Sequence, residues 1–311
     1  MATADIQSAT FTDENKAREA LELVRWPNGP TCPHCGNLDQ LKIAKSQGKA
    51  ARPGLYYCAA CNGQFTVTVG TVMERSKIPL TKWLFAMHLM GASKKGMSAL
   101  QLQRMLGITY KSAWFLCHRI REAMTTPSSG PIGGEGKTVE VDETYIGGKE
   151  KNKHKSKKLN AGRGAVGKMP VVSLVERDGT TRSLHVANVT SKTLRPVLTK
   201  HINKKTHIMT DESAVYPSIG GSFAGHGTVN HSAGEYVKAG TNDHTNTVES
   251  RFSLIKRAVF GTHHSISEAH LGRYLVEWDF KWNTRKVKDG ERAALIAKGI
   301  EGKRLTYRPL N

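Results

Sequence analysis

Two Cys-X-X-Cys pairs constrain the fold of this chain more than any other feature of the sequence. Cys32 and Cys35 form the first pair, Cys58 and Cys61 form the second, and 22 residues lie between them. Each pair can turn into a knuckle that directs two thiolates at one ion, and two knuckles complete the sulfur tetrahedron that suits Zn²⁺. The spacing predicts a zinc ribbon over 26–72 with a β-hairpin between the knuckles. Four protein ligands leave no open position, so the site should be structural.

Other roles for these side chains are less consistent with the pattern. His34 lies inside the first knuckle and is an alternative ligand, but four cysteines already complete the set. Buried thiols would need no metal, and a redox motif would need a βαβ context that is missing. Five cysteines, an odd number, argue against a disulfide framework. The fifth, Cys117, shares a helical stripe with Ala113 and Ile120 and should be a core residue.

The charge balance indicates a polyanionic partner. Lys and Arg number 46 against 26 Asp and Glu, which gives a formal net charge of +20. An anionic membrane surface would also attract such a chain, but no strongly basic amphipathic helix is evident. The sequence has no run of 18 apolar residues, and residues 1–12 lack a basic segment followed by an apolar core. Neither a transmembrane helix nor a secretory signal is expected.

Two short helices are expected after the ribbon. Residues 98–106 form an amphipathic segment, Gly107 begins a turn, and 110–124 form a second segment that Thr109 can cap. A short helix, a glycine turn and a basic second helix are typical of a DNA-reading helix-turn-helix, although an ordinary helical hairpin shares the pattern. The face opposite the apolar stripe of the second helix would read DNA, and it comprises Lys111, Phe115, His118 and Arg119.

The composition changes after the glycine-rich segment 128–134. Alternating and short apolar runs predict strands, and helical patterns separate and follow them, so an α/β or α+β domain is expected. The segment 149–168 has seven Lys and one Arg against a single Glu and should be a solvated loop or hairpin arm. The expected order is an N-terminal helix at 1–25, the ribbon at 26–72, the helix-turn-helix at 76–126, a linker at 127–136, the α/β domain at 137–290 and a C-terminal tail at 291–311.

Asp142 lies inside a predicted strand. Side chains alternate between the two faces of this strand, which places Val139 and Tyr145 on the face expected in the core and Glu140 and Asp142 on the other face. An acid in the middle of a strand is costly unless something pairs with it. Asp142 is therefore a candidate metal ligand.

Two further acids suit the same role. Asp211 ends a short strand, and ligand sites of open α/β sheets lie at such ends. Glu249 lies on a predicted helix, with Lys256 two turns later along the same edge. Each acid alone would by default be a surface carboxylate. Together with Asp142 they match the needs of a two-metal phosphoryl-transfer site, in which hard oxygen ligands hold Mg²⁺.

Several motifs along the chain are shared with a known family. They are Arg25-Trp-Pro-Asn-Gly before the first cysteine pair, Phe65-Thr-Val-Thr-Val-Gly-Thr, Val141-Asp-Glu-Thr-Tyr-Ile-Gly-Gly, Thr210-Asp-Glu, His244-Thr-Asn-Thr-Val-Glu-Ser-Arg-Phe and Tyr274-Leu-Val-Glu-Trp-Asp-Phe-Lys-Trp-Asn. In combination they resemble bacterial insertion-sequence transposases, above all the insertion-sequence fifteen-ninety-five family, the ISXO-like transposases. The resemblance extends from about residue 10 to 290.

This resemblance implies a multidomain protein: a zinc ribbon, an all-α helix-turn-helix, and an α/β ribonuclease-H-like catalytic domain with a mixed sheet and a DDE-type triad. Asp142, Asp211 and Glu249 fall on the triad and would bind catalytic Mg²⁺, with Mn²⁺ as a substitute. Lys256 falls where such enzymes often have a basic residue. Some members carry Asn as the third residue, and Asn246 is that alternative here. We favour Glu249 because a carboxylate is the better Mg²⁺ ligand.

The implied function is that of a DNA transposase. It would bind the inverted repeats of an insertion sequence, cleave its 3′ ends and join them to target DNA, as a homo-oligomer on paired ends in the bacterial cytoplasm, at the nucleoid. A non-catalytic DNA-binding regulator and a nuclease of the same fold that cuts without joining are the alternatives. His244 would orient or shuttle a proton, or have no role. Besides the helix-turn-helix residues, the expected DNA contacts are Lys153, Lys155, Lys157, Lys158, Lys256 and Arg257.

Overall fold

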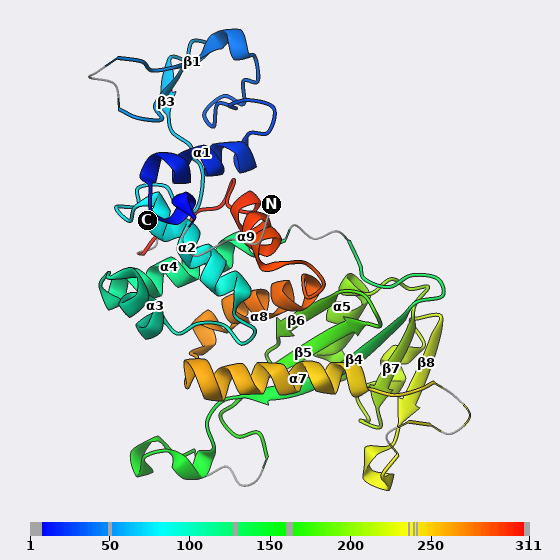
Figure 1. The fold of residues 1–311 in the computed structure, drawn as a ribbon. Coiled ribbons are helices and arrows are strands. Elements are labelled where there is room, and N and C mark those ends of the chain that lie inside the picture. Colours follow the sequence, from blue (N-terminus) through cyan, green and yellow to red (C-terminus); the bar gives the residue numbers. More distant parts are fainter. Residues whose placement is uncertain are drawn as a thin grey trace. The chain divides into compact units, whose positions relative to one another are not determined.

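The computed structural model describes residues 8–307, except 49–51, 127–129, 160–163, 236, 239 and 241. It divides into two compact units, one made of 1–126 with 286–311 and the other of 127–285. We call them unit 1 and unit 2, and Figure 1 shows their elements. Among the described residues, no helix combines the length and the apolar character needed to cross a membrane.

The ribbon of unit 1 is a small antiparallel sheet. Its strands β1 (Ile43–Lys45), β2 (Tyr56–Cys58) and β3 (Gly63–Phe65) pair in that order. The expected hairpin between the two cysteine pairs is thus β1–β2. The ring of Trp26 packs edge-on against Tyr56 and Phe65, with centroids 5.4 and 5.8 Å away. These three buried rings form the ribbon's small apolar core, which is too small to stabilise such a module without a metal.

Several helices of unit 1 begin at a residue whose side chain caps the first turn. Asp13 accepts hydrogen bonds from the amides of Asn15 and Lys16 and caps α1 (Glu14–Arg25), which lies within the segment 1–25 where a helix was expected. Residues 1–7 lie outside the described part of the chain. The other helices of this half are α2 (Leu80–Ala92), α3 (Ala99–Leu106) and α4 (Tyr110–Ala123).

The connection between α3 and α4 has the turn chemistry that the sequence indicated. Ser98 caps α3, and Gly107 ends it with φ +58°, a conformation that glycine adopts with little strain. The hydroxyl of Thr109 accepts a hydrogen bond from the amide of Ser112 and caps α4. A helix, a short turn and a second helix are therefore present at the expected residues.

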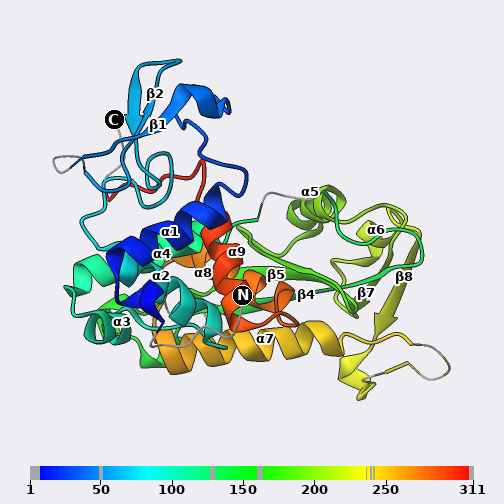
Figure 2. The same cartoon turned by 45° about the horizontal axis from the view of Figure 1, so that its top comes forward.

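The C-terminal segment is not a simple tail, in contrast to the expectation for 291–311. It contains α9 (Asp289–Lys298), which packs on α2 of the same unit (Figures 1 and 2). Gly91 of α2 allows the close approach, because a Cβ at that position would lie 3.3 Å from the Ile296 side chain. Arg292 also donates to the Gly91 carbonyl at 2.9 Å. Ile296 and its neighbours thereby complete a core more than 200 residues away in sequence.

Unit 2 is built on a mixed five-stranded sheet of order β6-β5-β4-β7-β8. β5 runs antiparallel to β4 and β6, whereas β7 and β8 are parallel to β4. The strands are β4 (Thr138–Ile146), β5 (Met169–Glu176), β6 (Thr181–His185), β7 (His207–Asp211) and β8 (Gly225–Val229). The basic segment is the β4–β5 connection and contains two short 3₁₀ turns, Glu150–Asn152 and Lys155–Lys157.

Helices cover both faces of this sheet. α5 (Ser191–His201) and α6 (Pro217–Gly220) pack with the β4 residues Val139 and Val141 on one face. α7 (Asn246–Ala258) and α8 (Glu268–Asn283) pack on the other face, together with Ile146. A mixed sheet between two helical layers is consistent with the ribonuclease-H-like fold that the resemblance implied.

Candidate catalytic and metal sites

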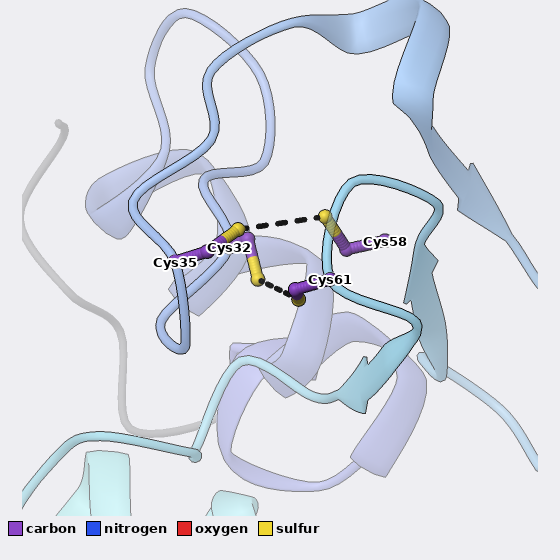
Figure 3. Close-up of side chains that lie close together, drawn as sticks. All are labelled: Cys32, Cys35, Cys58 and Cys61. Carbon is purple, nitrogen blue, oxygen red and sulfur yellow. Dashed lines mark hydrogen bonds between the residues drawn. The ribbon is translucent and has the colours of Figure 1, made fainter.

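The four cysteines of the ribbon converge on one point (Figure 3). The sulfurs of Cys32 and Cys61 are 3.7 Å apart and those of Cys35 and Cys58 are 3.8 Å apart. All four ligand atoms lie within 4.8 Å of one another, and no other group of three or more His, Cys, Asp or Glu side chains in the described residues does so. His34 is not in the group, and its Nε2 instead lies 3.1 Å from the Gln64 carbonyl oxygen.

These spacings fit zinc. A tetrahedron with Zn–S bonds of about 2.3 Å has sulfur–sulfur edges of roughly 3.8 Å. Each knuckle is followed by a residue with positive φ, Gly36 at +72° and Asn62 at +56°, which lets the chain turn back after presenting its two thiols. The cluster therefore supports a structural zinc site with four cysteine ligands.

The expected DNA-reading face of α4 is only partly exposed. Lys111 is exposed and Phe115 is half-buried, but His118 and Arg119 are 1% and 7% exposed. Arg119 donates to the Glu74 carbonyl at 2.6 Å, and its guanidinium lies over the Trp83 ring. The assignment of His118 and Arg119 to a DNA surface is therefore wrong. The helical pattern gave the side opposite the apolar stripe but could not show that other parts of unit 1 cover it.

The exposed start of α4 has a neighbour from the C-terminal segment. The Nζ atom of Lys111 lies 4.7 Å from the centre of the Tyr307 ring, and the Phe115 ring packs edge-on against the same tyrosine at 5.7 Å. Lys303 donates to the carbonyls of Ala123 and Thr125 at the other end of the helix. The C-terminal segment thus contacts both ends of α4.

In unit 2, the sheet register brings Asp142 and Asp211 together. β4 and β7 are parallel, and Thr138, Val139 and Glu140 pair with the residues 69 positions later. The same register, continued two residues further, places Asp142 beside Asp211. The backbone amide of Ser213 donates to the Asp211 carboxylate at 3.1 Å and helps to orient it.

Glu249 approaches the same region from the first turn of α7. Its carboxylate lies 3.1 Å from Nε2 of His231 and accepts a hydrogen bond from Thr245 at 3.3 Å. Its side chain is 43% exposed, so it is accessible to solvent and substrate. Asn246, at the start of the same helix, is exposed.

The electrostatics of the site reflect the crowding of acids. Burial raises the pKa of the Asp142 carboxyl to about 8, and the negative charges of Glu143, Asp211 and Glu249 add to this effect. Burial also raises the pKa of Asp211, as does the charge of Glu212. The ionised carboxylates would be stabilised by cations, which is the requirement of a site for hard divalent ions. Asp142, Asp211 and Glu249, the candidate triad, do not form a group whose ligand atoms all lie within 4.8 Å of one another. A site for two ions about 3.5–4 Å apart needs more widely spaced ligands than a site for one ion.

Several acids near the triad have roles that the sequence did not indicate. Glu143 accepts a hydrogen bond from the hydroxyl of the buried Tyr216. Glu212 accepts a hydrogen bond from the Ser232 hydroxyl and further bonds from the amides of His231 and Ser232, both at 3.0 Å. These bonds, the one from the hydroxyl above all, lower the pKa of Glu212 to about 2. Glu212 thereby holds the turn that places His231 beside Glu249. The sequence has no local signal for His231, because the contact depends on the fold of the β8–α7 connection.

Tyr145 is a further correction. The alternation put it with Val139 and Val141 in the core, but it is 39% exposed. The core beneath α5 and α6 includes Val139 and Val141 and ends before Tyr145. Alternation along a strand therefore predicted the face correctly but not how far the covering layer extends.

The remaining expected DNA contacts lie in two places. In the β4–β5 connection, Lys155 and Lys157 are exposed, Lys158 is half-buried, and Lys153 forms a 2.6 Å ion pair with Glu150. Near the end of α7, Lys256 and Arg257 are exposed, and Arg257 donates to the Ser253 hydroxyl at 2.7 Å. Exposure leaves four of these cations accessible to a polyanion: Lys155, Lys157, Lys256 and Arg257.

A four-cysteine ribbon, a helical unit and a mixed sheet with acids on adjacent parallel strands have the make-up of a DDE-type transposase. Comparison with known families agrees: residues 12–64 match the transposase zinc-ribbon domain, and residues 133–283 match the ISXO2-like transposase domain. The chain belongs to this family of transposases and is a catalytic, DNA-binding protein. It is also 29% identical over 276 residues to a protein of Halobacterium salinarum described as an uncharacterized protein in transposable element ISH50. That alignment covers 86% of this chain and 90% of the relative.

Proposed function

We propose that this transposase binds the inverted repeats of its element, cleaves the 3′ ends and joins them to target DNA through a site formed by Asp142, Asp211 and Glu249. The observation that carries the proposal is the convergence of these acids. Two come from adjacent parallel strands, and the pKa of Asp142 is raised first by burial and then by the charges of Glu143, Asp211 and Glu249. Such mutual repulsion is expected where a site is built to hold cations.

The protein groups would have distinct tasks. Asp142 and Asp211 would form the buried floor of the site, and Glu249 would close it from the more exposed helix side. These three acids would hold Mg²⁺, which would activate a water or the 3′-hydroxyl of the DNA and stabilise the charge that develops on the phosphate. Glu249 is favoured over Asn246 because a carboxylate is the better Mg²⁺ ligand and because the charge of Glu249 acts on Asp142. Lys256, two turns along α7, would contact the DNA backbone.

DNA binding would be shared among several surfaces. We assign end recognition to the ribbon and to the exposed start of α4 around Lys111. The basic β4–β5 connection, with Lys155 and Lys157, would hold phosphates without reading sequence. We further propose that the protein acts as a homo-oligomer on paired ends, at the nucleoid of a bacterial cytoplasm.

Cleavage and joining test the proposal directly. The inverted repeats would be taken from the DNA that flanks the gene, labelled, and incubated with the protein, Mg²⁺ and a target plasmid. Asp142→Asn, Asp211→Asn and Glu249→Gln should each lose about 100-fold or more in rate, because each removes a hard anionic ligand without changing the side chain's shape. Binding to the end DNA, measured by gel shift, should hardly change.

Asn246→Ala is the matched control for the third residue and should retain far more activity than Glu249→Gln. A dead Asn246→Ala beside a fully active Glu249→Gln would transfer the role to the asparagine. Full activity of Asp211→Asn would reject the two-metal site. Cleavage without joining would identify a nuclease, and binding without cleavage a regulator.

A further inference from the structure

One fully buried acid of unit 2 lies beside the proposed triad and is not part of it. Glu140 is fully buried on β4, two residues before Asp142 and on the same face of the strand. Its carboxylate accepts hydrogen bonds from Arg177 Nε at 2.8 Å and from both the amide and the hydroxyl of Thr247 at 2.8 Å. The amide of Val248 donates at 3.0 Å. A buried carboxylate is tolerated only with such a complete set of partners.

These bonds join the strand to the start of α7. The first amides of a helix have no partner within the helix and are usually capped by a nearby side chain in the sequence. Thr245, at the N-cap position of α7, makes no such bond, and its hydroxyl instead donates to Glu249. Glu140, which lies on β4, caps the helix instead. Its negative charge also suits the positive end of the helix dipole.

Arg177 anchors the chain that leads into the same helix. While its Nε donates to Glu140, Nη1 donates to the Asn242 carbonyl at 2.8 Å and Nη2 to the His244 carbonyl at 2.9 Å. The ring of His244 adds to the cluster, with Nδ1 3.2 Å from a Glu140 oxygen. One guanidinium therefore fixes both the capping acid and the loop before α7 in a planar, rigid geometry.

We propose that Glu140 and Arg177 form a clamp that positions Glu249 for metal binding. Glu249 directly follows the capped Val248, and Asp142 lies two residues beyond the capping Glu140. The clamp therefore connects the third acid to the first through a few rigid bonds. It acts through Glu249 and Asp142 and does not touch the reacting atoms, so its members are positioning residues. This inference rests on the proposed function of the triad as the metal site.

The test measures metal binding as well as activity. Mn²⁺ is titrated by calorimetry into the zinc-loaded full-length protein, and amide hydrogen exchange follows Thr247 and Val248. Glu140→Gln should weaken Mn²⁺ binding about 10–100-fold, the usual effect of losing a partner behind a ligand. The two amides should exchange faster relative to the rest of unit 2, and binding to end DNA should stay unchanged. Arg177→Lys keeps the charge but loses the fork of donors, so it should shift the same readouts less, and it serves if Glu140→Gln does not fold.

Glu277→Gln is the matched control. Glu277 is also a fully buried acid of unit 2 with a cationic partner, Lys281, at 2.5 Å, but it lies in α8. Its substitution should lower stability while leaving Mn²⁺ affinity and the α7 amides unchanged.

The outcomes separate the clamp from the triad. If Asp142→Asn and Glu249→Gln weaken Mn²⁺ binding but folded Glu140→Gln and Arg177→Lys do not, the clamp is refuted and the metal site stands. If Asp142→Asn and Glu249→Gln also bind Mn²⁺ as the unchanged protein does, the triad assignment fails, and the clamp with it. A Glu277→Gln protein that loses Mn²⁺ affinity as Glu140→Gln does would reduce the clamp to general stability.

Discussion

Replacing Asp142 with Asn should stabilise unit 2 at alkaline pH and in the absence of Mg²⁺. In the folded chain burial raises the pKa of this carboxyl from its ordinary value of 3.8 to about 8, with a contribution from neighbouring acids. Below about pH 4 both the folded and the unfolded chain hold the proton. As the pH rises from 4 to 8, the unfolded chain releases this proton before the folded chain does, so the free energy of unfolding falls. The fall in stability is complete above about pH 8. Asparagine does not titrate in this range, so Asp142→Asn keeps this part of the free energy of unfolding.

The magnitude follows from the two pKa values. Each pKa unit corresponds to about 1.4 kcal/mol, so the difference between 3.8 and about 8 sets an upper bound of roughly 6 kcal/mol. Relaxation and solvent screening at a partly exposed site reduce such values, and we expect about 2 kcal/mol at pH 8.5. That free energy corresponds to a roughly 30-fold smaller equilibrium constant for opening of the sheet in Asp142→Asn.

Hydrogen exchange of peptides from β4 and β7 measures this in unit 2 alone. The intrinsic exchange rate of an amide depends on pH, so comparing the two proteins at the same pH removes this effect from the ratio of their exchange rates. Asp142→Asn should match the unchanged protein near pH 4 and exchange about 30-fold more slowly at pH 8.5, and added Mg²⁺ should protect only the unchanged protein. Glu268→Gln alters an exposed acid of the same unit and should have no effect. An identical exchange ratio at both pH values would refute the reasoning.

Three further predictions concern metal and DNA binding. Cys35→Ser should release about one zinc and unfold the ribbon, because metal binding supplies much of the folding free energy of so small a module; metal analysis and circular dichroism test this, and a folded ribbon would contradict it. Deleting 151–158 should weaken DNA binding on all sequences alike and flatten its salt dependence in gel shifts, so a loss of end selectivity alone would oppose it. Lys111→Ala should weaken end binding by about 1 kcal/mol without changing thermal stability, because Lys111 is exposed. Arg119→Ala should mainly destabilise unit 1, by about 2 kcal/mol, because Arg119 is buried. The reverse pattern would reject the assignment of Lys111 to the DNA surface and of Arg119 to the core.

The sequence alone determined those features whose physics is local. Two ligands separated by only two residues need no more than a turn to meet, so the Cys32–Cys35 and Cys58–Cys61 pairs predicted the ribbon. Capping residues and a turn glycine set the ends of α3 and α4. Alternation placed Asp142 and Val139 on opposite faces of one strand. Each inference depends on residues near one another in the chain, where periodicity and turn chemistry decide the structure.

The tertiary structure decided what covers each face and which distant groups meet. His118 and Arg119 are buried, and Tyr145 is exposed, because packing between elements sets the limits of the core. The cap that Glu140 provides for α7 joins residues more than 100 positions apart. A pattern along the chain states which residues share a face, but long-range packing selects the partners of that face. The residues that hold a site in place are therefore harder to find in a sequence than the residues that form it.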